Sequence, residues 1–297
     1  MYHLFRFATR ILPWIPRRLA YALGNVLGLI AWLIARKARR QATKNMIHVL
    51  GAQMQETRAG RRRLRRTVKG MFVNNMRNYL DLFTLQSLST EKILRNIHIK
   101  GWEHLSAALA QGKGVIIFVA HQGPFDYIIQ YMGIKGYDVT IPVERLKDQR
   151  VLDLILGLRR SHGINYLPLA GSTSMRTIVQ KLRDNKIVLI AADRAIEGQS
   201  VEADFFGAPA RLPGGPIKLA QRTGAALLIG VNCYRTPQGL ATGQWSPLSL
   251  KLTGEQHTDT KNIMRAVIEK FEDSIREHPE QWVAFTPIWL EDIKNDS

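Results

Sequence analysis

Short apolar runs alternate with amphipathic stretches from Asn96 onward, and this alternation limits the possible folds more than any other feature of the chain. The runs are too short for helices and several are rich in valine and isoleucine, which favours strands. They cover residues 97–99, 114–120, 138–143, 164–167, 186–192 and 225–232. The stretches with helical spacing cover residues 103–111, 125–132, 147–161, 172–185, 213–223 and about 258–278. The pattern predicts an α/β fold with a mixed, mostly parallel central sheet flanked by helices.

Positive charge is concentrated at the N-terminal end of the chain. The sequence has 42 Lys and Arg against 24 Asp and Glu, which gives a formal net charge of +18. Residues 1–70 hold 16 of those bases and one acid, Glu56, so +15 of the total lies there. We therefore divide the chain into a basic N-terminal region over 1–70 and one globular domain over 71–297. The basic region needs a polyanionic partner, either nucleic acid or an anionic membrane surface.

An uncharged stretch from Leu19 to Ala35 favours the membrane. Its 17 residues would form a helix about 25 Å long, at the short end of what crosses a hydrocarbon core of about 30 Å. We expect one hydrophobic helix that either spans the bilayer or lies in its interface, with Trp14 and Trp32 near the headgroups. The basic cluster that begins at Arg36 stands where a signal peptidase needs small residues, so the anchor should stay uncleaved. A buried core helix of a soluble domain is the alternative.

A second basic run, from Arg58 to Lys69, leads into apolar residues that recur at helical spacing as far as Phe83. This segment predicts an amphipathic helix. Its basic end is either a solvated face or a contact for lipid phosphates, worth about 1 kcal/mol per residue near an anionic surface. Aromatic and basic residues do not interleave on a strand pattern, so an RNA-binding sheet has no support.

The most apolar strand candidate, GVIIFVA, ends directly in His121. Ligands bind at the carboxyl ends of the strands in a sheet of this kind, so this histidine is at the right edge for catalysis. Gly123 and Pro124 would turn the chain into a helix, and the spacing lets the Asp126 carboxylate fold back onto the imidazole. That contact would fix the tautomer while the other ring nitrogen takes a proton from a substrate hydroxyl. A histidine with a purely structural role is the alternative.

Other catalytic chemistries lack their sequence signatures. The chain has no G-x-S-x-G motif, and its one cysteine, Cys233, lies in an apolar strand where an inert thiol is expected. The stretch from Pro213 to Pro216 contains neither a P-loop lysine nor a G-x-G-x-x-G motif. The sequence signals no metal site, because no Cys/His cluster has zinc-binding spacing. Direct transfer to a hydroxyl activated by a histidine and a carboxylate is what remains.

The segment from His121 to Asp126 resembles the H-x4-D/E motif of the glycerolipid acyltransferase superfamily. The chain is similar in particular to the branch that contains bacterial lipid A late acyltransferases and mycobacterial-type phosphatidylinositol mannoside acyltransferases. The stretches that carry this resemblance are IPVERLKD (141–148), LRRSHGINYLPL (158–169), AADRAIEG (191–198), VEADFFGAPARLPGGP (201–216), RTGAALL (222–228) and HPEQWVAFTPIW (278–289). Their order and spacing make the signal stronger than a single motif.

The resemblance implies an acyltransferase domain over residues 71–297, attached to the cytoplasmic face of the inner (plasma) membrane. It would transfer a fatty acyl group from acyl-CoA or an acyl carrier protein to a hydroxyl of a glycolipid, like a lipid A precursor or a phosphatidylinositol mannoside. His121 would be the general base and Asp126 its orienting partner. Four further residues would bind substrate: Glu144, Arg159, Arg194 and Glu202. For Glu144 and Arg159 the alternative is that they hold each other. The expected partners are anionic membrane lipids, the glycolipid acceptor and the acyl donor as co-substrate, with no other cofactor, no metal and no nucleic acid.

Two other functions stay open at this point. A lysophospholipid or glycerol phosphate acyltransferase would use the same motif, but we find no F-P-E-G-T-R-like block. A non-enzymatic basic protein that binds membranes or nucleic acid would use the segment over residues 1–70 alone. Replacing His121 would then change nothing.

Overall fold

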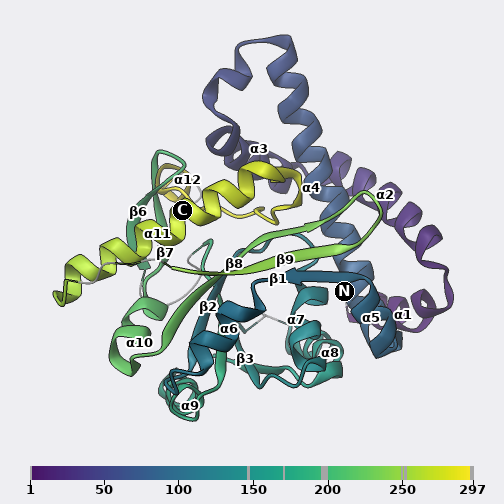
Figure 1. The fold of residues 1–297 in the computed structure, drawn as a ribbon. Coiled ribbons are helices and arrows are strands. Elements are labelled where there is room, and N and C mark those ends of the chain that lie inside the picture. Colours follow the sequence, from purple (N-terminus) through teal and green to yellow (C-terminus); the bar gives the residue numbers. More distant parts are fainter. Residues whose placement is uncertain are drawn as a thin grey trace.

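A central sheet organises the molecule. The computed structural model describes residues 2–145, 148–169, 171–194, 200–248, 250 and 253–294. The sheet strands in this part of the chain are β1 (Ile97–Lys100), β2 (Val115–Val119), β3 (Val139–Val143), β4 (Asn165–Pro168), β5 (Ile187–Ala191), β8 (Ala226–Arg235) and β9 (Ala241–Pro247). They lie in the order β1-β9-β8-β2-β5-β3-β4 (Figure 1). Among these strands only β8 and β9 pair antiparallel, so the predicted mixed, mostly parallel sheet is confirmed.

The central strands β2 and β5 are apolar along their whole length because helices cover both faces of the sheet. Along β2, Ile116 and Phe118 face one hydrophobic cluster, whereas Val115 and Ile117 face the other. The first cluster is covered by α3 (Arg36–Leu50), α4 (Arg58–Thr84), α9 (Gly171–Arg183), α10 (Gly215–Thr223) and α11 (Gln256–Glu277). The second is covered by α5 (Thr90–Arg95), α6 (Trp102–Leu109), α7 (Phe125–Ile134) and α8 (Gln149–Arg159). The result is a three-layer α/β/α core.

Most elements expected from the sequence are present within a few residues. Lys147, the first residue of the helix expected over 147–161, lies outside the described residues, as do 195–198 of the AADRAIEG stretch. Two features of the β-structure were not expected. One is the hairpin of β6 (Ser200–Phe205) and β7 (Ala208–Pro213), and the other is β9, which joins β1 to the rest of the sheet.

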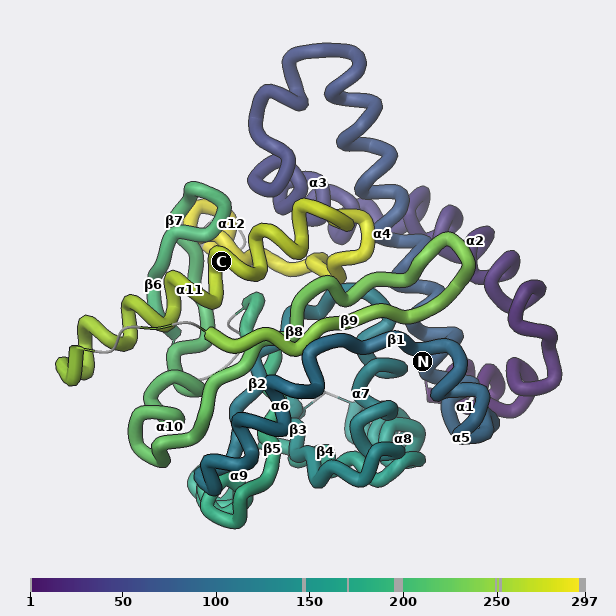
Figure 2. The backbone as a smooth tube through the Cα atoms, in the orientation of Figure 1, coloured from purple at the N-terminus to yellow at the C-terminus, as the bar shows by residue number. Residues whose placement is uncertain are grey.

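The N-terminal region is helical and packs on the domain. It begins with α1 (Tyr2–Ile11), η1 (Leu12–Trp14) and α2 (Arg17–Ile34), and η2 (Ala52–Gln55) links α3 to α4. The α3–α4 arm projects from the sheet, and α2 lies beside the body end of α4 (Figures 1 and 2). Helix α4 runs without a break through residue 70, so the division expected there falls inside one helix. Among the described residues, α2 is the one helix long and apolar enough to cross a membrane.

Candidate active site

The parallel pairing of β2 with β5 brings His121 and Asp193 together. Val119 at the end of β2 pairs with Ala191 at the end of β5, and the Ala192 amide donates to the Val119 carbonyl at 2.9 Å. His121 and Asp193 each lie two residues beyond their strand, so the sheet register sets them opposite one another. Both therefore occupy the carboxyl edge of the sheet, where α/β folds bind their ligands.

Asp193 holds His121 through two contacts. Its Oδ1 lies 2.8 Å from the imidazole Nδ1, and its Oδ2 accepts from the His121 backbone amide at 3.1 Å. The indole N–H of Trp282 also donates to Oδ2, at 2.7 Å. Burial alone would raise the pKa of the Asp193 carboxyl, but the imidazole, the Arg194 guanidinium and the indole hold that pKa well below its usual range. Asp193 is therefore an ionised carboxylate at neutral pH, despite being only 1% exposed.

The contact with an ionised carboxylate assigns the proton of the neutral imidazole to Nδ1, which donates to Asp193. The lone pair of His121 is then on Nε2, which makes no hydrogen bond to any residue in the described part of the chain. The imidazole is 24% exposed, and its ring packs edge-on against Phe125 with the ring centroids 5.9 Å apart. A half-buried imidazole with a free, oriented Nε2 can take a proton from a bound hydroxyl.

The loop that carries His121 is fixed at every residue. Val283 donates to the His121 carbonyl at 2.7 Å, and the Gln122 side chain forms a reciprocal pair with Ser274 at 2.8 Å in each direction. Gly123 has a φ of +63° and lies so close to β8 that an added Cβ would be 2.4 Å from the Cys233 carbonyl oxygen. Only glycine fits this position without strain, so the turn after β2 has a single geometry.

Asp126 does not contact His121, which corrects the pairing expected from the spacing. Its carboxylate instead forms a buried ion pair with Arg159 at the end of α8, with 2.7 Å between Arg159 Nε and Asp126 Oδ1. A second guanidinium nitrogen donates to Oδ2 at 3.1 Å. The helix turn after Pro124 places Asp126 in the first turn of α7, directed at α8 and away from the imidazole. The same ion pair gives Arg159 a partner other than Glu144.

The remaining predicted residues fall into two groups. Glu144 follows β3 directly, and β3 pairs with β5, so Glu144 lies at the same sheet edge as Asp193. Arg194 adjoins Asp193, and its guanidinium donates to Thr286 Oγ1 at 3.2 Å. Glu202 lies apart on the β6–β7 hairpin, where it faces Arg211 at 3.7 Å with its side chain 62% exposed. The structure thus brings Glu144 and Arg194 to the His121 edge and leaves Glu202 on a solvated strand.

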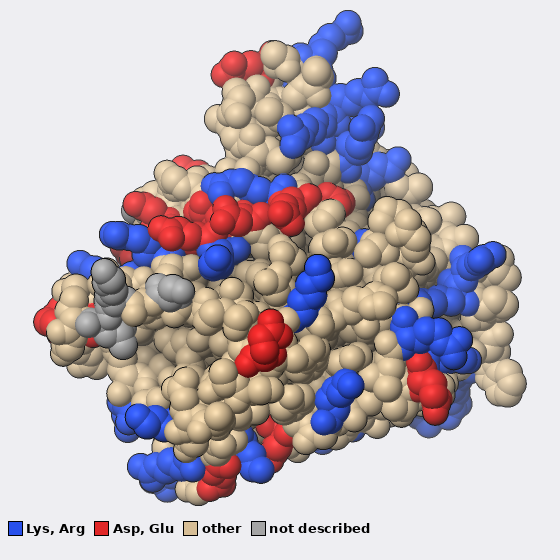
Figure 3. Space-filling model, viewed as in Figure 1, with Lys and Arg blue, Asp and Glu red and all other residues tan. Residues whose placement is uncertain are grey.

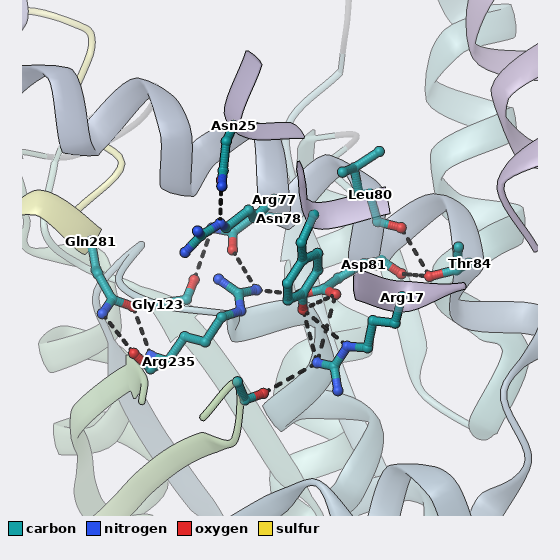
Figure 4. A network of polar contacts seen from close by, with 12 residues as sticks. Arg17, Asn25, Arg77, Asn78, Leu80, Asp81, Thr84, Gly123, Arg235 and Gln281 are labelled. Atoms are coloured by element: carbon teal, nitrogen blue, oxygen red, sulfur yellow. Dashed lines mark hydrogen bonds and ion pairs between the residues drawn. The ribbon is translucent and has the colours of Figure 1, made fainter. Parts of the chain in front are cut away.

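A buried polar network supports the His121 loop from the N-terminal side (Figure 4). Arg235 at the end of β8 forms an ion pair with Asp81 of α4 and donates to Asn78 Oδ1 at 3.2 Å. Asn78 in turn donates to the Gly123 carbonyl at 2.9 Å. From α2, the Tyr21 hydroxyl donates to Asp81 at 2.6 Å. Helices α2 and α4 therefore belong to the scaffold of the loop that holds His121.

Sequence reasoning assigned no role to Asp193 or Trp282. Asp193 had a usable signal, because it follows an apolar strand by the same two residues as His121 does. Trp282 follows a 3-10 turn (Pro279–Gln281) at the far end of the chain, and nothing in its sequence neighbourhood indicates its contact with Asp193.

A histidine with a free Nε2, oriented by a buried carboxylate at a strand end, is an arrangement that can accept a proton from a hydroxyl. Comparison with known proteins gives the family. The model described as bacterial lipid A biosynthesis acyltransferase matches residues 1–291, so the chain belongs to this family and is an acyltransferase.

The chain is also similar to enzymes named phosphatidylinositol mannoside acyltransferase. The protein from Mycobacterium tuberculosis (strain CDC 1551 / Oshkosh) is 32% identical over 221 residues, which cover 73% of this chain and 68% of the relative. The protein from Mycolicibacterium smegmatis is 26% identical over 235 residues, covering 77% and 74%. The resemblance expected from the sequence is therefore confirmed for the branch and for the class of enzyme.

Proposed function

We propose that this acyltransferase moves a fatty acyl group from an acyl-CoA or acyl carrier protein thioester to a hydroxyl of a glycolipid, with His121 as general base. The acceptor is a phosphatidylinositol mannoside or a lipid A precursor, the two kinds of lipid that the names of its relatives and family contain. The observation that carries the proposal is the 2.8 Å contact between His121 and Asp193, which leaves Nε2 free to accept a proton.

The reaction needs no covalent enzyme intermediate. The acceptor hydroxyl gives its proton to His121 Nε2 as its oxygen attacks the thioester carbonyl carbon, and the carbonyl π electrons move onto oxygen. Collapse of the tetrahedral adduct breaks the C–S bond, and the imidazolium returns the proton to the departing sulfur. Asp193 stays ionised throughout, holds the tautomer and stabilises the imidazolium.

The polar residues at the same edge are candidates for substrate binding. Arg194 adjoins Asp193 and Glu144 lies at the same edge of the sheet, and a guanidinium and a carboxylate suit a phosphate and sugar hydroxyls respectively. Arg159 acts differently, because its ion pair with Asp126 joins the end of α8 to the start of α7 and stabilises the packing of these two helices. Glu202 would meet substrate only if the acceptor extends to the β6–β7 hairpin.

Membrane association belongs to the same proposal. Its support is the apolar helix α2, the basic region around it and relatives whose names contain membrane lipids. Figure 3 shows Lys and Arg gathered on the projecting α3–α4 arm. The exposed bases there include Arg61, Arg62, Arg63, Arg65, Arg66 and Lys69. Such a surface attracts anionic headgroups, and we place it at the cytoplasmic face of the membrane.

The test is product identification. Purified protein in detergent is incubated with labelled palmitoyl-CoA or palmitoyl-acyl carrier protein and with either a phosphatidylinositol mannoside or a lipid A precursor. Mass spectrometry should find a new acylated glycolipid with the wild type and with His98→Ala, whose histidine is exposed on β1. His121→Ala should form at most about a hundredth as much product. No product from the wild type with either donor and either acceptor would contradict the proposal.

A further inference from the structure

Most of the large hydrophobic side chains exposed in the described residues lie in the first three helical segments, α1, η1 and α2. Of the twelve large hydrophobic side chains exposed in the described part of the chain, eleven lie between Leu4 and Ile34, and the other is Met175. They include Leu4 and Phe7 of α1, Trp14 of η1 and a row along α2. A concentration of exposed apolar side chains of this kind marks an interaction site.

The opposite face of α2 is packed against α4 along its length. Ala20, Gly24 and Gly28 recur every four residues and are buried. A Cβ added at Gly28 would lie 2.7 Å from the Val73 Cα, and one at Gly24 would lie 2.6 Å from a methyl group of Leu80. The two helices therefore touch backbone to backbone, and α2 cannot move away without losing this interface.

Polar contacts fix α2 to the body at both ends and in the middle. Near its start, Arg17 donates to the Gly239 carbonyl at 3.3 Å and the Tyr21 hydroxyl donates to Asp81 of α4 at 2.6 Å (Figure 4). In the middle, Asn25 accepts from Arg77 of α4 at 2.8 Å. Near its end, the Trp32 ring lies under two guanidinium groups, those of Arg39 at 5.3 Å and Arg65 at 5.0 Å.

These contacts exclude a crossing of the bilayer by α2 in the folded protein. If α2 spanned, α4 would enter the hydrocarbon with it, together with Asn74, Arg77 and Asp81 on the same helix and the sheet beneath. Polar and charged groups at that depth are strongly unfavourable. In addition, α2 has 18 residues, about 27 Å, which is less than the usual hydrocarbon thickness of about 30 Å.

The charges around the apolar surface fit one anionic leaflet. Arg6, Arg10 and Arg18 are exposed beside α1 and the start of α2, and Arg36, Lys37 and Arg40 are exposed just after its end. No acid precedes Glu56 in the sequence. A helix with an apolar face, basic flanks and an interfacial Trp lies along the headgroup boundary.

We propose that α1, η1 and α2 lie in the plane of one leaflet, with the row Leu19, Val26 and Leu33 facing the acyl chains and the catalytic body remaining on one side of the membrane. This inference deepens the membrane association proposed above, and it does not depend on acyl transfer. The protein would be bound to one surface of an anionic bilayer without spanning it.

Depth measurements along α2 test this geometry. Single cysteines replace Leu19, Val26 and Leu33, which are 62%, 53% and 58% exposed and seven residues apart on one face. Burial raises the pKa of the native Cys233 thiol to about 12, so it does not compete for the label. Each variant carries a spin label and is bound to vesicles of phosphatidylglycerol and phosphatidylcholine. We expect three similar depths, about 5–10 Å below the headgroups, and a water-exposed label at the matched control Met175→Cys.

A spanning helix would give a different profile. Val26 would lie about 10 Å deeper than Leu19 and Leu33, since seven helical residues rise about 10 Å. That profile, or labels that stay in water at all three positions, would overturn the inference.

A second measurement determines sidedness. It uses an impermeant maleimide and single cysteines that replace His3 and Gln53, both exposed. Both should react from the same side of a sealed membrane, and reaction from opposite sides would contradict in-plane binding.

The outcome is separable from the acyltransferase proposal. Depth and sidedness are measured without substrate, so a protein with the expected depths and no acylated product would refute the proposed reaction and leave the in-plane geometry standing. A protein that forms a labelled product but shows a spanning profile would support the proposed reaction and refute the in-plane geometry.

Discussion

His121 Nδ1 lies 2.8 Å from Asp193 Oδ1, across two parallel strands whose ends are paired in register. The two residues are 72 positions apart in sequence. Their contact depends on the β2–β5 ladder and on the turn that Gly123 allows, and Trp282 closes the far side of the carboxylate. The site is thus built from three distant segments of the chain, and each can be changed separately.

Replacing Asp193 by asparagine should lower stability in a pH-dependent way. The folded-state pKa of Asp193 is depressed, so the carboxylate stabilises the fold above about pH 4 and this contribution is lost as the pH falls toward the folded-state pKa. Urea unfolding in mild detergent should therefore give a wild-type advantage on the order of 1–3 kcal/mol at pH 7, and a smaller one at pH 3. A difference in unfolding free energy between the wild type and Asp193→Asn that is the same at pH 7 and pH 3 would contradict the ionised state of Asp193.

Asp126→Asn should affect stability more than chemistry. The change leaves the Arg159 guanidinium largely buried without its ion partner, which costs about 3 kcal/mol. The folded fraction should keep its turnover within a few-fold of wild type, because the orientation of His121 does not depend on Asp126. Thermal unfolding and activity measured on the same sample check this. Restored stability in Asp126→Asn with Arg159→Gln would confirm the pair, whereas a loss of turnover as large as in Asp193→Asn would contradict its structural role.

Gly123→Ala should disturb the loop that carries His121. Alanine at a φ of +63° is strained by about 1–3 kcal/mol, and its Cβ would also collide with the Cys233 carbonyl. Gly112→Ala is the matched control, because Gly112 has a φ of +72° and nothing within 4 Å of the added Cβ. We expect both variants to lose stability and only Gly123→Ala to lose activity in the folded enzyme. Equal activities would show that the collision is relieved without moving His121.

Gly28→Leu should weaken the attachment of α2 to α4. The larger side chain meets the backbone of Val73, and overpacking of this kind costs about 1–3 kcal/mol. Ala22→Leu places the same side chain on the exposed face of α2 and should be neutral in detergent. The comparison is made by thermal unfolding and by limited proteolysis of α2. If α2 were an independent spanning anchor, both variants would unfold like the wild type.

The parts of the fold that could be read from the sequence are those governed by local pattern. Strands β2 and β5 are buried on both faces, so their apolar runs are unambiguous. Strand β9 contains Gly243 and Pro247 and has few β-branched residues, and it exists because β1 and β8 pair with it. In the β6–β7 hairpin, exposed residues alternate with half-buried ones along most of β6 and with buried ones along β7, and the prolines at 209 and 213 obscure this pattern in the sequence.

Part of the candidate site could likewise be predicted from the sequence, and part could not. The position of His121 at a strand end follows from the run before it, and the structure has it there. Its partner was assigned from short-range spacing to Asp126, whereas the register of two strands selects Asp193. A helix turn can carry a nearby carboxylate toward or away from a histidine, and Arg159 decides the direction here. A single sequence carries no local signal for such long-range pairings.

The central claim is that His121 and Asp193 act as one unit in acyl transfer, and a double-mutant cycle of turnover tests it most directly. His121→Ala and Asp193→Asn are each compared with the wild type and with the double variant. The substrates are labelled palmitoyl-CoA and whichever acceptor the product identification shows to be acylated. The account predicts a loss of about 10²- to 10⁴-fold for His121→Ala and no further loss when Asp193→Asn is added, because the carboxylate acts only through the imidazole. Independent, multiplying losses, or wild-type turnover in His121→Ala, would contradict it.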